Sequence, residues 1–95
     1  MTKITPFNIV QHELIGLYAR VVESSNKFLV GIEGLVIDET RNMLVILHQE
    51  RPKKVPKSVC VFEFILPEGV KVRVKGQLLI GSPEDRIKKV LKRRW

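Results

Sequence analysis

The sequence predicts a small all-β protein, a closed barrel of five to six antiparallel strands with a short helix at each end. Short runs rich in Val, Ile, Leu and Phe recur along the 95-residue chain, separated by turn-forming residues. In residues 70–75, valine alternates with Lys or Arg, which is the period of a half-buried strand. A domain this small has little else with which to cover its strand edges, and barrel closure removes them. We therefore expect one domain over residues 1–95.

Residues 1–15 are predicted to form an N-terminal arm that ends in a short helix. Pro6 breaks regular structure in the arm. Asn8 is placed to cap a helical turn that runs to about Glu13. The barrel is expected over residues 16–81.

The first half of the barrel is predicted to contain three strands separated by polar turns. Gly31 and Gly34 interrupt the second strand. Glycine inside a strand marks a bend, which suits a sheet that curls towards closure. The three strands are expected at residues 17–23, about 28–37 and 43–47.

The second half of the barrel is predicted to begin with a basic loop, residues 49–57. Pro52 and Pro56 are expected to prevent regular structure there. A Pro-x-Gly turn at residues 67–69 separates the two strands that follow. Those strands are expected at 58–66 and 70–75, and a brief one at 78–80 is placed to close the barrel.

Residues 82–95 are predicted to form a basic C-terminal helix. Ser82 is a favourable N-cap, Pro83 suits the first helical position, and Asp85 stands three residues after the cap. Apolar residues at 87, 90 and 91 then give a narrow stripe.

The charge of the chain favours nucleic-acid binding. Lys and Arg number 17 against 10 Asp and Glu, which gives a net charge of +7, and the pI is near 9.9. The cations concentrate on the basic loop, on one face of the strand at 70–75, and on the C-terminal helix. If these elements meet, they form a surface for RNA phosphates. The predicted RNA-binding residues are Arg51, Lys53, Lys54, Lys57, Arg73, Lys75, Arg86, Lys88, Lys89, Lys92, Arg93 and Arg94.

The few aromatic residues favour recognition of folded RNA by shape and backbone rather than by base stacking. Phe62 and Phe64 share one strand face and are assigned to the core. Tyr18 and Trp95 are then the remaining candidates for stacking on a base.

No arrangement of residues predicts catalysis or a bound metal. Cys60 lies mid-strand and is expected to be a buried, inert thiol. A single cysteine with His12 and His48 cannot build a zinc site or an intrachain disulfide. Asp38 and Glu39 are adjacent, so on a strand they point to opposite faces, and Asp38 is expected to bind turn amides. We expect no catalytic residue, no metal site and no cofactor bound by this chain.

The lack of recognisable targeting signals in the sequence also bears on location. The N-terminal residues lack a signal-peptide pattern, and no apolar run approaches membrane-spanning length. These features predict an intracellular, cytoplasmic protein with no membrane partner.

Six short segments carry a resemblance to a known family. They are residues 13–17, 21–24, 30–34, 36–40, 42–46 and 83–89. In this order they resemble archaeal ribonuclease P protein component 1 over nearly the whole chain. The resemblance implies an Sm-like (SH3-type) barrel in a ribonucleoprotein whose RNA removes the 5′ leader of precursor tRNA, with Mg²⁺ at the RNA active site. Ser82 departs from the family pattern, in which Arg often precedes Pro-Glu-Asp-Arg. We expect this change to remove one phosphate contact that the family pattern implies and to strengthen the helix cap.

The resemblance also implies partners. They are the ribonuclease P RNA, a zinc-ribbon protein subunit that forms a heterodimer with this chain, the other ribonuclease P proteins and, indirectly, precursor tRNA. The N-terminal arm and an edge strand near 28–37, through Phe28, Val30 and Ile32, are assigned to the protein partner. The alternative is an SH3-like interaction module whose basic surface meets an acidic protein.

Overall fold

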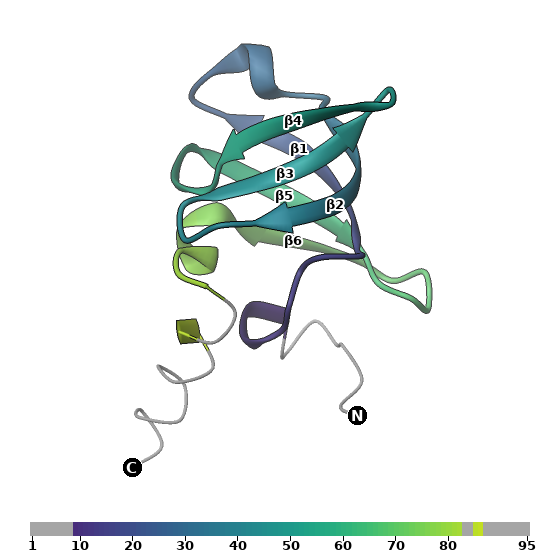
Figure 1. The fold of residues 1–95 in the computed structure, drawn as a ribbon, viewed down its shortest axis with the longest axis vertical. Helices are drawn as coiled ribbons and strands as arrows, with labels where there is room; N and C mark the ends of the chain where they lie inside the picture. Colours follow the sequence, from purple (N-terminus) through teal and green to yellow (C-terminus); the bar gives the residue numbers. More distant parts are fainter. Residues whose placement is uncertain (1–8, 83–84, 87–95) are drawn as a thin grey trace.

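A computed structural model describes residues 9–82, 85 and 86. These residues form one antiparallel sheet of six strands (Figure 1). Short 3-10 turns precede β1, follow β6, and connect β1 to β2 and β4 to β5. The strands are β1 (Tyr18–Ser24), β2 (Glu33–Glu39), β3 (Met43–His48), β4 (Arg51–Pro56), β5 (Cys60–Ile65) and β6 (Lys71–Lys75). The 3-10 turns are η1 (Ile9–Gln11), η2 (Lys27–Leu29), η3 (Lys57–Val59) and η4 (Gly76–Leu79). The predicted all-β class is confirmed, and the six antiparallel strands agree with the predicted five to six.

The predicted closure of the barrel is wrong for the described residues. The strand order is β4-β3-β2-β1-β5-β6, so the sheet curls but β4 and β6 remain its two edges (Figure 1). Residues 78–80, expected to form a closing strand, lie in and just after the turn η4. Gly76 explains the change of direction: a Cβ there would lie 1.7 Å from the Lys57 carbonyl oxygen. The absence of a side chain lets η4 pack its backbone directly on η3.

Residues 51–56 form the edge strand β4 rather than the predicted loop. His48 pairs with Arg51 across a tight turn, and hydrogen-bonded pairs alternate with non-hydrogen-bonded pairs along such a hairpin. Pro52 and Pro56 fall at positions whose missing N–H groups would point away from β3. Proline is tolerated on the outer side of an edge strand, and it hinders pairing with another strand there.

The second predicted strand is shorter than expected and lies inside the sheet. β2 begins at Glu33, because residues 27–29 form η2, where the Phe28 amide donates to Asn26 Oδ1 at 3.1 Å. β2 pairs with both β1 and β3, so the prediction of an edge strand near 28–37 is wrong. Register shifts in β1 and β2 accompany the curvature of the sheet.

The core lies on the concave side of the sheet. Phe62 and Phe64 are fully buried, with ring centroids 5.9 Å apart, as predicted. Val74 is buried as predicted, whereas Val70 precedes β6 and is exposed. Residues from outside the sheet complete the core, namely Ile9, Leu14 and Leu79.

The two predicted terminal helices are described only in part. η1 is a single 3-10 turn, and its predicted cap Asn8 lies outside the described residues. At the other end the predicted capping contact is present: the Asp85 amide donates to Ser82 Oγ at 3.2 Å. Residues 83–84 and 87–95 lie outside the described residues, so the C-terminal helix stays a prediction.

Candidate nucleic-acid interface

Two of the predicted RNA-binding cations are buried. The side chains of Lys57 and Arg86 are 0% and 2% exposed, and both bind the buried carboxylate of Glu39. Lys57 Nζ lies 2.6 Å from Glu39 Oε2. Arg86 donates Nη1 to Oε2 of the same carboxylate and Nη2 to Oε1. The prediction that these two cations contact RNA phosphates is wrong, because Glu39 and backbone carbonyls enclose them. We call these three residues the buried ion cluster.

Backbone carbonyls supply the remaining partners of Lys57. Its ammonium donates to the carbonyl oxygens of Thr40, Arg41 and Gly81 at 2.8, 3.3 and 3.1 Å. Burial lowers the pKa of Lys57, while the hydrogen bond and charge of Glu39 act in the opposite direction. The ammonium therefore ties the hairpin between β2 and β3 to the chain after η4.

Arg86 links a third segment, the one around η1, to the buried ion cluster. It donates Nε to the carbonyl of Val10 at 2.7 Å and Nη2 to that of His12 at 2.9 Å. Nη1 donates to the carbonyls of Leu79 and Gly81, each at 2.9 Å. The segment around η1 and the segment after η4 thus meet at one end of the curled sheet (Figure 1).

Glu39 was not predicted as a structural residue, and the register of β2 explains why. Strict alternation would place Glu39 on the same face as Leu35 and Ile37, both of which are exposed. The register shifts between Val36 and Asp38, so that Glu39 turns inward. The prediction for Asp38 is confirmed, since its Oδ1 accepts from the Glu39 amide at 2.8 Å.

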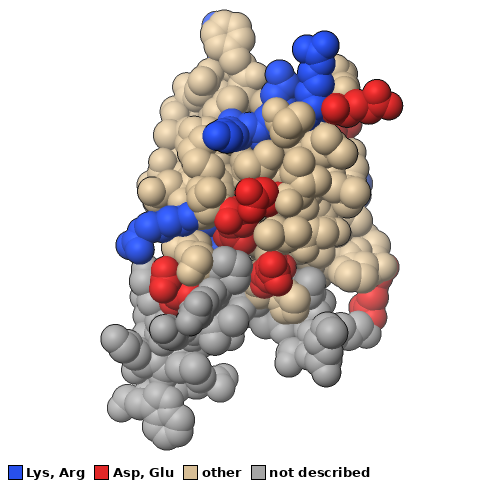
Figure 2. Space-filling model, in the orientation of Figure 1, with Lys and Arg blue, Asp and Glu red and all other residues tan. Residues whose placement is uncertain are grey.

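The exposed cations of β4 form the clearest basic surface. Arg51, Lys53 and Lys54 are all exposed, and none has an ion-pair partner among the residues that the structure describes. Figure 2 shows Lys and Arg side chains gathered over β4, whereas acidic rather than basic side chains interrupt the area over β2 and β3. We call these three residues the β4 basic edge.

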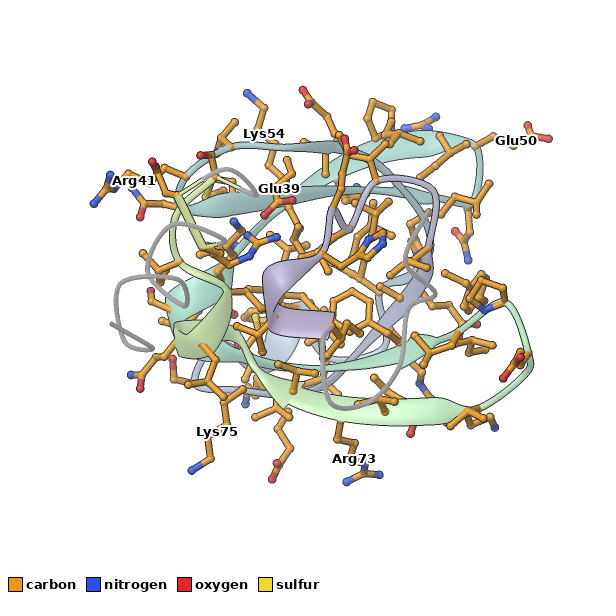
Figure 3. The ribbon with its side chains drawn as sticks, turned by 90° about the horizontal axis from the view of Figure 1, so that it is seen from below. Glu39, Arg41, Glu50, Lys54, Arg73 and Lys75 are labelled. Atoms are coloured by element: carbon orange, nitrogen blue, oxygen red, sulfur yellow. The ribbon has the colours of Figure 1, made fainter. Side chains whose placement is uncertain are left out.

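The cations of β6 lie on another side of the molecule. Figure 3 shows Lys54 pointing away from one side of the curled sheet and Arg73 and Lys75 pointing away from the opposite side. Arg73 is exposed but lies 3.6 Å from the Glu63 carboxylate. The cations of β4 and those of β6 therefore do not form one continuous surface. The remaining predicted cations, Lys88, Lys89, Lys92, Arg93 and Arg94, lie outside the described residues.

Lys75 borders an open hollow of about 490 Å³. Ser24, Ser58 and Gln77 also line it, with Cys60 among the lining residues. Cys60 is buried, and burial raises its pKa, so the thiol stays protonated at neutral pH. The prediction of a buried thiol is confirmed.

The predicted partner-binding residues are unequally exposed. Phe28 is 85% exposed and Val30 is also exposed, whereas Ile32 packs partly against the core.

A separate apolar row crosses the outer face of the sheet. Tyr18 pairs with Leu35, and Leu35 pairs with Leu47 on the next strand. All three side chains are exposed. Apolar side chains that are exposed side by side are typical of a protein-binding surface. Sequence reasoning missed this row because it placed β2 at an edge.

Metal-binding groups and membrane-spanning helices are both missing from the described part of the chain. No group of three or more His, Cys, Asp or Glu residues there could hold a metal ion. No helix among the same residues is long and apolar enough to cross a membrane.

Known proteins resemble this chain over most of its length. The family model for ribonuclease P/MRP, subunit p29, matches residues 7–89. Ribonuclease P protein component 1 of Pyrococcus furiosus is 54% identical over 93 residues, 98% of this chain and 70% of the relative. The protein of the same name from Methanocaldococcus jannaschii is 54% identical over 90 residues, 94% of each chain.

A solved structure agrees with this assignment. Mth11, described as a homologue of human RNase P protein Rpp29, is 45% identical, with a TM-score of 0.58. The match covers 80% of this chain and 99% of that one. On the family match and these identities, this chain belongs to the ribonuclease P/MRP subunit p29 family.

Proposed function

We propose that this chain is a protein subunit of ribonuclease P that binds and stabilises the RNA subunit through exposed basic edges. The observation that carries the proposal is the β4 basic edge. Arg51, Lys53 and Lys54 lie on an edge strand, exposed and without carboxylate partners in the described part of the chain. Such cations are available to neutralise phosphates and release counterions.

The proposed complex removes the 5′ leader of precursor tRNA, and we assign the chemistry to its RNA subunit. The relatives in Pyrococcus and Methanocaldococcus carry the name ribonuclease P protein component 1. In this chain the Glu39 carboxylate and the Cys60 thiol are buried, which supports a role without direct contact with the scissile bond. Mg²⁺ would act at the RNA active site. An Sm-like fold and a cytoplasmic location belong to the same proposal.

The apolar row supports binding of a protein subunit. Tyr18, Leu35 and Leu47 would bury their exposed side chains against the zinc-ribbon subunit, with Phe28 and Val30 as further contacts. A protein partner there would leave the β4 basic edge available to RNA. Other ribonuclease P proteins would join through the RNA, and contact with precursor tRNA would be indirect.

Reconstitution tests this function. The RNA subunit and the zinc-ribbon subunit are mixed with the chain, and cleavage of precursor tRNA is followed at limiting Mg²⁺. The chain should raise the cleavage rate. Neutralising Arg51, Lys53 and Lys54 to Gln should remove most of the gain, whereas neutralising Arg20 and Lys27 should keep it.

The rival role as an SH3-like module for an acidic protein predicts a different result. In that case the chain neither raises the cleavage of precursor tRNA nor protects the RNA subunit from hydroxyl radicals in a footprinting experiment. Cleavage of precursor tRNA by the purified chain alone would contradict both roles.

A further inference from the structure

We propose that the open hollow beside Lys75 holds one unstacked nucleotide of an RNA, with its phosphate at Lys75 and an amino group of its base at Glu23. The inference rests on the proposed RNA-binding function and deepens it, because it adds a contact that reads a base. The hollow has a volume of about 490 Å³, and ligand pockets usually measure roughly 300–1,000 Å³. It lies apart from the β4 basic edge, since Lys75 and Lys54 point away from opposite sides of the curled sheet (Figure 3).

Three residues in register across neighbouring strands run along the hollow. Glu23 on β1 pairs with Val61 on β5, and Val61 pairs with Lys75 on β6. Residues directly opposite one another in an antiparallel sheet share a face. Neighbouring strands lie about 4.8 Å apart, so the backbones of Glu23 and Lys75 are about 10 Å apart, with the valine between them. A carboxylate and an ammonium therefore flank an apolar centre.

A register shift in β1 turns Glu23 towards this row. Val21 is buried, so strict alternation along the strand would bury Glu23 as well. The register shifts between Val21 and Glu23, and Glu23 is exposed. Such irregularities redirect a side chain and are more frequent beside functional sites than elsewhere. The shift thus adds an acceptor to the hollow that the sequence pattern alone would place in the core.

The two charges of the row remain available to a ligand. In the neighbouring row Glu63 takes the central strand, and its carboxylate lies 3.6 Å from Arg73. Val61 takes that central position in the row of Glu23 and Lys75. Neither of these two charged residues has an ion-pair partner in the described part of the chain. The ammonium can therefore bind a phosphate, while the carboxylate accepts from an N–H group.

Neutral polar side chains surround the same hollow. Ser25, Ser58 and Gln77 line it and are exposed. Their side chains have no hydrogen-bond partner within residues 9–82, 85 and 86. Val59, 37% exposed, adds apolar surface. An unstacked nucleotide needs these same groups, because proteins bind its base edges and its 2′-hydroxyl by hydrogen bonds and cover its ring with apolar atoms.

The backbone around the hollow is held in place. A Cβ at Gly76 would lie 1.7 Å from the Lys57 carbonyl oxygen and 2.8 Å from that of Cys60, so η4 packs directly on η3 and β5. The Ser25 amide donates to the Val59 carbonyl at 3.1 Å, which fixes the end of β1 against the same elements. A site that is already formed loses less conformational freedom when it binds.

The carboxylate of Glu23 limits the choice of base. Adenine, cytosine and guanine each carry an exocyclic amino group that can donate to a carboxylate, whereas uracil carries none. We therefore expect the hollow to take an adenosine, a cytidine or a guanosine. Either ribonuclease P RNA or precursor tRNA could supply it, and the experiments below separate these two sources.

Glu23→Ala tests the inference through the sign of its effect on RNA binding. On a surface that only attracts phosphates, loss of a negative charge should strengthen binding or leave it unchanged. If Glu23 accepts from a base, the same change should weaken binding of the RNA that supplies the nucleotide about tenfold. Glu50→Ala is the matched control, because Glu50 is an exposed acid that does not line the hollow. It should not weaken binding, and circular dichroism confirms that both variants are folded.

Analogue interference then identifies the nucleotide. Each RNA is transcribed with a small fraction of purine riboside, inosine or 4-deaminocytidine, which lack the amino group of adenosine, guanosine or cytidine. RNA bound by the wild type should be depleted of one analogue at one position. Glu50→Ala should keep this depletion, and Glu23→Ala should remove it. A position in ribonuclease P RNA assigns the nucleotide to the RNA subunit, and a position in precursor tRNA assigns it to the substrate. Depletion in neither RNA, or depletion that Glu23→Ala keeps, would overturn the inference.

Two further variants test the hollow and its cation separately. Ser58→Phe fills the hollow without changing the charge, so it should weaken binding and remove the same depletion. Lys75→Gln should make the log–log salt slope shallower by about 0.9, the value for one phosphate. RNA binding unchanged by both Glu23→Ala and Ser58→Phe would defeat the inference and would favour a peptide as the ligand of the hollow.

Failure of this inference can be told apart from failure of the proposed function. RNA binding that is weakened by neutralising the β4 basic edge, but not by Glu23→Ala, defeats this inference alone. A wild-type chain that binds neither RNA defeats the proposed function itself.

Discussion

Arg86 and Glu39 lie 47 residues apart in the sequence and form a buried, bidentate ion pair. The pair joins the end of β2 to the chain that follows η4, and Lys57 binds the same carboxylate. Removing the carboxylate would leave two buried cations with only carbonyl partners, which is far more costly than removing an exposed charge.

Glu39→Gln should therefore destabilise the protein by about 3–5 kcal/mol, the usual cost of breaking a buried pair. Urea unfolding followed by circular dichroism measures the decrease in stability. Glu33→Gln is the matched control, because Glu33 lies 4.0 Å from Arg20 on the surface, where a pair contributes about 0–1 kcal/mol. Equal destabilisation in the two variants would contradict a structural role for the cluster.

The pH dependence of the free energy of unfolding should report the titration of Lys57. Burial is the largest cause that lowers its native pKa below the ordinary value of 10.5. At a pH between the lowered native pKa of Lys57 and 10.5, the unfolded chain binds more protons at this site than the native chain does. The free energy of unfolding of the wild type should therefore rise with pH in this window, relative to Lys57→Met.

Urea unfolding of both proteins from pH 7 to 10.5 measures that difference. Below the native pKa of Lys57 both states are protonated, so the difference should be flat. A wild type that loses stability relative to Lys57→Met as pH rises would show that the native pKa is raised instead.

The turn between β3 and β4 should be improved by glycine. Gln49 and Glu50 have φ values of 49° and 66°, which are unfavourable for residues with a side chain. Glu50→Gly should stabilise the protein by about 1 kcal/mol, which raises the melting temperature by about 4–8 °C in a domain of this size. Glu50→Gln removes the same charge without relieving the backbone, so it should leave the melting temperature nearly unchanged. A lower melting temperature in Glu50→Gly would contradict this account of the turn.

Cys60 should resist alkylation until the sheet opens. Burial and a raised pKa both lower the fraction of reactive thiolate. Iodoacetamide should label the native protein about a hundredfold more slowly than the protein in urea. Ser58→Cys in a Cys60→Ala chain places a thiol at a neighbouring exposed position and should react at once. Rapid labelling of native Cys60 would show that the strand β5 does not shield it.

Apolar periodicity predicted the strands that bury one face. Phe62 and Phe64 were assigned to the core because they recur at the period of a strand, and the structure buries both. The capping contact of Ser82 was also predictable, since it depends on neighbouring residues alone.

Features that depend on distant residues were not predictable in this way. The strand β4 was missed because Pro52 and Pro56 suggest a loop. Only the register with β3 shows that the backbone nitrogen atoms of both prolines point away from β3, where no N–H is needed. Glu39 was missed because a register shift in β2 reverses the direction of its side chain. Lys57 and Arg86 were assigned to RNA for their charge, whereas their partners come from segments far along the chain.

The role of the β4 basic edge is tested most directly by the salt dependence of binding to ribonuclease P RNA. If about six phosphates are contacted, the wild-type log–log slope should lie near −4 to −5. Lys53→Gln with Lys54→Gln should make the slope shallower by about 2, whereas Arg20→Gln with Lys27→Gln should leave it unchanged. A double variant at the β4 basic edge with the wild-type slope and affinity would contradict the account.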